Sequence, residues 1–198
     1  EHTPVYQYYD KNFTLIKETK LSVKTTKSGM LQYPRHAGVS GALFVRSWVP
    51  NYFTSPLSEI DPLTGAIVQA GNPGLGMDSY MAGDGVNIIW DQYTNNISRT
   101  WYKISTKTLA SIASNTYSGS STSAIWGGSY NNKFWYYGTY RMTEYSSDNW
   151  ASIRSLQFPS QSQTGVFDCL DNSIYAAVKN ASTGVLYHVD YTTGANRG

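Results

Sequence analysis

Short stretches in which apolar and polar residues alternate recur along the whole chain. The clearest are residues 5–9, 43–48, 86–90, 100–104, 133–137, 173–178 and 185–189. Clusters of Gly, Asn, Asp, Ser and Pro separate them, and no segment keeps the helical spacing i, i+3, i+4, i+7 over two turns. Period-two runs between turn residues predict β-strands. We therefore expect an all-β protein.

A repeat emerges when five of these segments are aligned on one Asp or Ser, which we call the anchor. The anchors are Asp10, Asp61, Ser105, Ser146 and Asp190, separated by 51, 44, 41 and 44 positions. Large apolar residues stand one position before each anchor (Tyr9, Ile60, Ile104, Tyr145, Val189) and four positions before it (Tyr6, Leu57, Trp101, Met142, Leu186). We expect these positions to face the core, together with Phe44, Phe134 and Tyr175.

Each unit of the repeat contains four predicted strands. Weaker strands at residues 35–39, 79–82, 123–126 and 165–170 precede the strands upstream of the last four anchors. The anchor turn joins the third and fourth strands, and its Asp or Ser can accept a hydrogen bond from the backbone two residues on. Gly65 and Gly194 in that turn suit a positive φ. Four antiparallel strands per 41–51 residues are typical of a β-propeller blade.

The anchor turn of residues 58–67, SEIDPLTGAI, resembles the x-x-I-D-P-x-T-G-x-I outer hairpin of many secreted β-propeller repeats. Residues 186–194, LYHVDYTTG, are its second-best copy. The resemblance implies a single β-propeller domain over residues 1–198. About 4.5 repeats leave three arrangements open: an incomplete five-bladed propeller, a closed four-bladed one, or a piece of a longer chain.

Composition narrows the functional classes. Charged residues make up 14% and aromatic residues 15% of the chain, with 17 Tyr and 6 Trp, which is the opposite of a disordered protein. A net charge of +2 gives no reason to expect a nucleic acid or a membrane as partner. Low charge with abundant Ser, Thr, Asn and Tyr is typical of extracellular, virion-surface or cell-surface β-proteins. The glycosylation sequons at Asn12, Asn96 and Asn180 are about as many as chance gives.

Metal, cofactor and nucleophile signatures are missing from the sequence. One cysteine, Cys169, excludes an intrachain disulfide and a cysteine-cluster zinc site. The histidines His2, His36 and His188 have no metal-ligand spacing, and no phosphate loop or nucleophile elbow occurs. We therefore expect no cofactor and no metal.

Carboxylates carry the enzymatic alternative, because glycosidase chemistry needs two of them facing each other across the substrate. The acids that remain after those in predicted turns are Glu59, Asp78, Asp91, Glu144 and Asp168, and the enzymatic candidates among them are Asp78, Asp91 and Asp168. Glu59 and Glu144 share the position two before the anchor with Lys103 and His188. We expect that position to face solvent. Glycosidase-like activity is thus an alternative to the non-enzymatic function that we favour.

The aromatic excess points to recognition. Aromatic residues gather with amide and guanidinium donors between the second and third strands of the repeats, and the candidate ligand-binding residues are Tyr52, Phe53, Tyr93, Asn95, Arg99, Tyr137, Tyr140 and Arg141. Rings pack on the C–H face of sugars while amides bond their hydroxyls. We expect a lectin-like or adhesin-like module that binds a glycan or a cell-surface polymer. The same residues would suit a protein interface, or simply tolerate exposure in hairpins.

A structural role is the other alternative. Incomplete end blades would expose unpaired strand edges, which favour pairing with other chains. This structural hypothesis predicts a homo-oligomer, or a partner chain bound at the open blade edges.

Overall fold

The computed structural model describes residues 5–9, 12, 14–20, 35–39, 42–46, 56–76, 79–95, 98–118, 124–128, 131–137, 141–157, 161–168, 171–180 and 183–198. Within these ranges the regular structure is entirely β, without a helix. The strands are β1 (Val5–Tyr9), β2 (Leu15–Lys20), β3 (Arg35–Val39), β4 (Ala42–Arg46), β5 (Leu57–Ile60), β6 (Ile67–Gly71), β7 (Ser79–Gly83), β8 (Ile88–Asn95), β9 (Ser98–Ile104), β10 (Ser111–Ser118), β11 (Ala124–Gly128), β12 (Lys133–Tyr137), β13 (Arg141–Ser146), β14 (Ser152–Gln157), β15 (Gln161–Asp168), β16 (Ser173–Asn180) and β17 (Thr183–Asp190).

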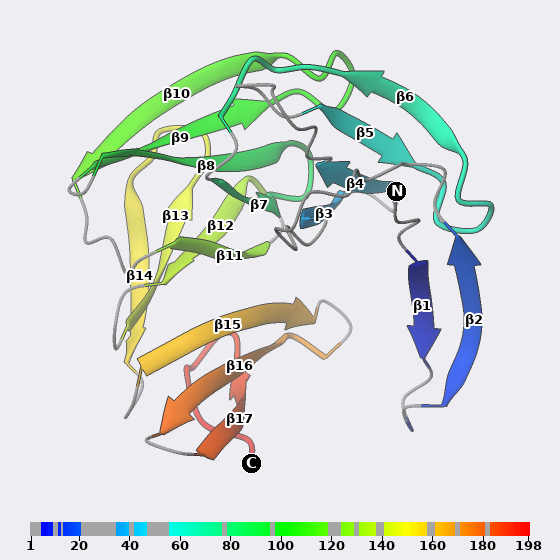
Figure 1. Ribbon diagram of the computed structural model, residues 1–198. Helices are drawn as coiled ribbons and strands as arrows, with labels where there is room; N and C mark the ends of the chain where they lie inside the picture. The colour runs from blue at the N-terminus through cyan, green and yellow to red at the C-terminus, as the bar shows by residue number, and fades with distance from the viewer. Residues whose placement is uncertain are drawn as a thin grey trace.

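These strands form five antiparallel sheets in chain order. The first sheet pairs β1 with β2, and the second, third and fourth sheets are the four-stranded meanders β3–β6, β7–β10 and β11–β14. The fifth sheet has three strands, β15–β17. The first strands of successive sheets lie side by side, β3 against β7, β7 against β11 and β11 against β15. Figure 1 shows the five sheets following one another around an arc. The predicted all-β propeller of four-stranded antiparallel blades is confirmed.

The anchor turns share one backbone geometry. Four residues after each of the last four anchors the chain has a positive φ: Gly65 (74°), Leu109 (54°), Trp150 (62°) and Gly194 (75°). The N–H of that residue donates to the anchor carbonyl over 2.8–2.9 Å. The predicted side-chain bond is also present; for example, the Leu63 N–H donates to Asp61 Oδ1 over 2.8 Å. The sequence thus predicted the turn correctly, including its two glycines.

The core lies between neighbouring sheets rather than inside any one of them. We call the side of a sheet that packs on the next sheet along the chain its forward face, and the opposite side its rear face. On the fourth sheet, Trp135 and Met142 point forward into a cluster with Ile174 and Val189 of the fifth sheet. Phe134, next to Trp135, points to the rear into a cluster with third-sheet side chains. Successive side chains of a strand point to opposite faces, so each inner sheet is buried on both sides.

Most of the predicted core positions are buried. The position before the anchor is at most 8% exposed in Ile60, Ile104, Tyr145 and Val189, and Phe44 and Phe134 are buried as expected. Tyr175 is half-buried, and the side chains of Tyr6 and Tyr9 lie outside the described residues. Leu57, Trp101 and Met142, four positions before their anchors, are fully buried.

Two expectations about these faces were wrong. Leu186, at the same repeat position as Leu57, is 61% exposed, because no described segment packs on the forward face of its sheet. Conversely, the position two before the anchor does not face solvent, since Glu144 is 1% exposed and Lys103 is 12% exposed. These side chains point forward, into the junction with the next sheet.

Candidate functional site

The connections between second and third strands all leave the same end of their sheets. The connections β4–β5, β8–β9 and β12–β13 occupy equivalent places in three successive meanders, and the inner strands of those meanders lie side by side. The anchor turns lie at the opposite end, because the third strand runs from one end to the other. The topology therefore brings the predicted recognition loops of three adjacent blades to one end of the propeller.

The predicted ligand-binding residues are described to different extents. Tyr52, Phe53 and Tyr140 lie outside the described residues. Tyr93 and Asn95 belong to the end of β8, and Tyr137 is the last residue of β12; only their backbone is described. Arg99 in β9 and Arg141 at the start of β13 have described side chains.

Arg99 is the second residue of β9, directly after the β8–β9 connection, and is 4% exposed. Its guanidinium donates to Asp91 Oδ2 over 2.8 Å, and Asp91 is fully buried. The guanidinium also lies 5.7 Å from the centre of the Tyr80 ring. The Arg99 guanidinium is thus buried against partners within its own sheet and is not exposed to a ligand in solution.

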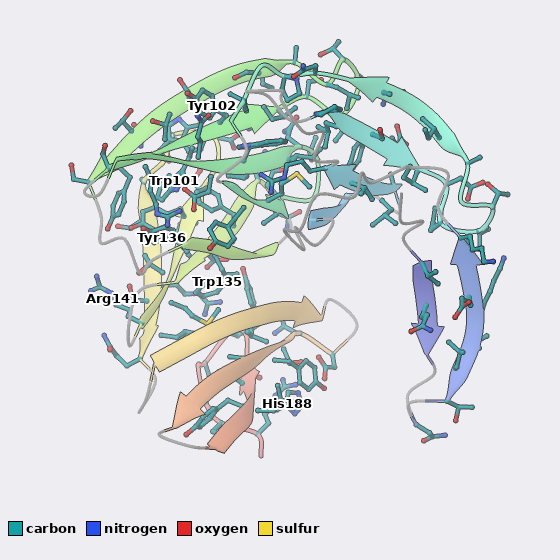
Figure 2. The ribbon with its side chains drawn as sticks, in the orientation of Figure 1. Trp101, Tyr102, Trp135, Tyr136, Arg141 and His188 are labelled. Carbon is teal, nitrogen blue, oxygen red and sulfur yellow. The ribbon has the colours of Figure 1, made fainter. Side chains whose placement is uncertain are left out.

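Two further arginines lie at the same end. Arg46, the last residue of β4, is 5% exposed, and its guanidinium lies 5.6 Å from the centre of the Trp90 ring in the third sheet. Arg141 is exposed at the rim, and Figure 2 shows it pointing away from the sheets. Of the two predicted arginines, Arg141 is the one whose guanidinium is open to a ligand in solution.

The enzymatic candidates are not brought together by described contacts. Asp91 is bound in the ion pair with Arg99, Asp78 lies outside the described residues, and only the backbone of Asp168 is described. Among the described residues, no group of three His, Cys, Asp or Glu could hold a metal ion. Nor does the described part of the chain contain a helix long and apolar enough to cross a membrane.

A large share of the described aromatic side chains is used for packing between blades. Trp101 stacks on Tyr117 at 5.0 Å between ring centres and meets Phe134, Tyr136 and Tyr145 edge-on at 4.9–5.2 Å. Figure 2 places Trp101 and Tyr136 in this junction of the third and fourth sheets. Burial raises the pKa of Tyr145 to about 12. The aromatic excess thus serves the core as well as the loops.

Polar contacts that cross the blade junctions were missed by the sequence analysis. At each of four successive junctions, one side chain donates to a backbone carbonyl in the next anchor turn. These contacts are Lys17 to Leu63 (2.7 Å), Gln69 to Thr106 (2.7 Å), Lys103 to Ser147 (3.2 Å) and Arg154 to Thr192 (3.0 Å).

An acid on the neighbouring strand, half-buried in Glu59 and fully buried in Glu144, supports two of these donors. Glu59 accepts from Gln69 over 2.6 Å, and Glu144 accepts from Arg154 over 2.8 Å. Glu144 also accepts from the Tyr191 hydroxyl in the fifth sheet. In both pairs the acid precedes its donor by ten residues and lies opposite it across the hairpin. That spacing around the anchor was the signal from which these contacts could have been predicted.

Comparisons with known proteins place the chain by its fold. No protein-family profile matches it, and no curated protein is similar in sequence. The solved structures to which it is similar include the following two. One is a glutaminyl cyclase from Myxococcus xanthus, with a TM-score of 0.53 and 18% identity over 82% of this chain and 70% of that one. The other is BamB from Moraxella catarrhalis, with a TM-score of 0.46 and 15% identity over 81% of this chain and 47% of that one.

The likeness to the glutaminyl cyclase extends to the fold alone, because the identity is 18%. The chain spans about half the length of the BamB structure. A propeller is a scaffold on which different functions are built from different loops. The function therefore has to be argued from the residues of this chain.

Proposed function

We propose that this protein is a non-enzymatic, lectin-like recognition module that binds a glycan or a surface polymer at the loop end of the propeller. The observation that carries the proposal is the convergence of three second-to-third-strand connections from adjacent blades at that end. Their residues combine aromatic rings, amides and a guanidinium, which suit the C–H faces and hydroxyls of sugars.

The described base of the loops supports this role. The ion pair between Asp91 of β8 and Arg99 of β9 joins these two strands close to the β8–β9 connection, and a site whose supporting strands are fixed in advance loses less entropy when it binds. Arg141 adds an exposed donor at the start of the neighbouring third strand. In this proposal Tyr52, Phe53, Tyr93, Tyr137 and Tyr140 supply the stacking surface.

The test is a glycan-array screen of the native chain, followed by the triple variant Tyr52→Ala, Tyr93→Ala, Tyr140→Ala on the best ligand. Each lost ring contact is worth about 0.5–1.5 kcal/mol, so we expect the triple variant to bind at least about tenfold more weakly. Leu63→Ala is the matched control, because Leu63 is 64% exposed in an anchor turn at the opposite end.

Circular dichroism and the melting temperature establish that all variants remain folded. Unchanged affinity of the triple variant would contradict the proposed site. A native chain that retains no glycan or polysaccharide on the array would contradict the proposed ligand class.

A further inference from the structure

Basic residues gather at the loop end of the propeller, where the second strands end and the third strands begin. Arg46 is the last residue of β4, Arg141 is the first residue of β13, and Lys179 is the second-last residue of β16. Arg35, the first residue of β3, lies at the same end because it pairs with Arg46. The second, fourth and fifth sheets thus each bring positive charge to this end.

The connections at the loop end add little negative charge. Residues 47–56, 96–97, 138–140 and 181–182, which join the second and third strands of four sheets, contain no Asp or Glu. Among the described residues at this end the acid is Asp91, and its ion pair with Arg99 leaves no net charge. In the segments that lead to the first strands, the sequence adds Lys24 and Lys27 before β3 and Asp78 before β7. The loop end is therefore positively charged.

At the opposite end of the sheets, charges of both signs occur and bind each other. Lys103 forms an ion pair with Asp148 over 2.9 Å, and Arg197 forms one with Asp190. Asp61 accepts from backbone N–H groups of its own turn. The chain has a net charge of only +2, but that sum hides an uneven distribution. A surface with one sign of charge attracts ligands of the opposite sign.

Two of the arginines lie directly opposite each other. Arg35 and Arg46 are Cα partners across β3 and β4, and like charges in such a pair destabilise a sheet. The Arg46 guanidinium lies 5.6 Å from the centre of the Trp90 ring, a cation–π contact that offsets part of this cost. An anion bound at this edge would lower the repulsion further, because it would interact favourably with both charges.

Arg141 combines positive charge with access to solvent. Its side chain is exposed, and Figure 2 shows it pointing away from the sheets. In the chain it directly follows Tyr140 and lies four residues after Tyr137, two of the rings in the proposed stacking surface. A guanidinium binds carboxylate and sulfate oxygens through charge-assisted hydrogen bonds. An acidic sugar offers both groups that this segment suits, a C–H face for a ring and an anion for the arginine.

We propose that the ligand of the loop end is an anionic glycan, whose sugars carry carboxylate or sulfate groups. This inference rests on the proposed glycan-binding function and names the class of glycan. Arg141 donates to an acidic group of the ligand, and Lys179 supplies a second cation from the adjacent sheet. An extended anionic chain that follows the loop end meets positive charge in successive sheets, which a neutral glycan does not use.

The first test measures the affinity of the native chain for two pairs of polysaccharides that differ in charge. The pairs are dextran sulfate with dextran, for sulfate, and polygalacturonate with its methyl ester, for carboxylate. We expect at least one charged polymer to bind about tenfold or more tightly than its neutral counterpart. Added salt should weaken that binding, because salt screens exposed charges.

Three results of this test overturn the inference. The first is equal affinity within both pairs, and the second is no binding of either charged polymer. The third is equally tight binding of a single-stranded oligonucleotide, which would assign the positive charge to a nucleic acid. The glycan-array screen decides separately on the proposed function: a chain that retains only neutral glycans keeps the lectin-like function and loses this inference.

The second test removes one positive charge from each end of the propeller. Arg141→Gln should weaken binding of the charged polymer about tenfold, or about 1.4 kcal/mol, which is the size of one hydrogen bond to a charged group. Lys107→Gln is the matched control, because Lys107 is exposed in an anchor turn at the opposite end, and it should bind within about twofold of the native chain. Circular dichroism verifies that both variants are folded. Unchanged affinity of Arg141→Gln, or an equal loss in both variants, overturns the inference.

Discussion

Leu57 and Leu186 occupy the same position of the repeat, yet one is fully buried and the other is 61% exposed. Replacing each by alanine removes the same atoms from two different environments. Leu57 packs in the cluster between the second and third sheets, and truncating a leucine in such a core costs roughly 3 kcal/mol, the lower part of the range measured elsewhere. The same change at an exposed position usually costs less than about 0.5 kcal/mol.

For a chain of this length, each kcal/mol lowers the melting temperature by about 2–4 °C. We therefore expect Leu57→Ala to melt about 6–12 °C below the native protein and Leu186→Ala to melt within about 2 °C of it. Calorimetry of both variants and of the native protein under the same conditions measures these shifts. Equal shifts for the two variants would refute the reasoning, because they would mean that repeat position, and not contact with a following sheet, decides burial.

Two further predictions concern the anchor turns. Gly65 and Gly74 both have positive φ, but a Cβ at Gly65 would lie 2.1 Å from the Lys20 carbonyl oxygen, whereas one at Gly74 would meet nothing within 4 Å. Gly74→Ala should therefore cost about 1 kcal/mol and Gly65→Ala clearly more, and comparable urea midpoints for the two would contradict this. The backbone N–H of Thr193 and the Arg197 guanidinium both donate to the Asp190 carboxylate, and they hold the pKa of Asp190 well below its usual range. Its stabilising effect is therefore present above about pH 4 and is lost as the pH falls further. Asp190→Asn should flatten the acid side of the curve of melting temperature against pH, and an unchanged acid side would contradict the role of this carboxylate.

The strands and the anchor turns could be predicted from the sequence because their signals are local. Alternation with a period of two and a turn residue at a fixed offset located β1 and β12 to the residue. The strand expected to begin at Val86 instead begins at Ile88. The reason is that Asp84 Oδ1 accepts from the N–H groups of Val86 and Asn87, which keeps both in the turn.

The environment of each face could not be predicted in the same way. Alternation separates two faces of a strand, but it does not distinguish a face in solvent from a polar face pressed against another blade. Glu144 was therefore expected in water, although Tyr191 and Arg154 enclose it. Leu186 shows the converse error, since a repeat position guarantees burial only where another segment packs on that face.

For the candidate site, the sequence predicted the kinds of residue and the loops, and the fold now brings those loops to one end. It did not predict that Arg99 is buried, because its partner Asp91 lies eight residues away on the neighbouring strand. A buried ion pair across two strands depends on their pairing, and that pairing is set by the whole sheet. The role of the aromatic loop residues in binding stays a prediction.

The polar contacts between blades have a consequence for how this chain can vary. At each junction the acceptor is a backbone carbonyl, which every amino acid provides, while the donor is Lys, Gln or Arg. A substitution in the accepting turn therefore leaves the contact intact, and the donor can change as long as it still presents an N–H group. Blades joined in this way can diverge in sequence without losing the hydrogen bonds between neighbouring sheets. This explains how successive sheets can keep the same kind of junction while sharing little more than an anchor residue and two apolar positions.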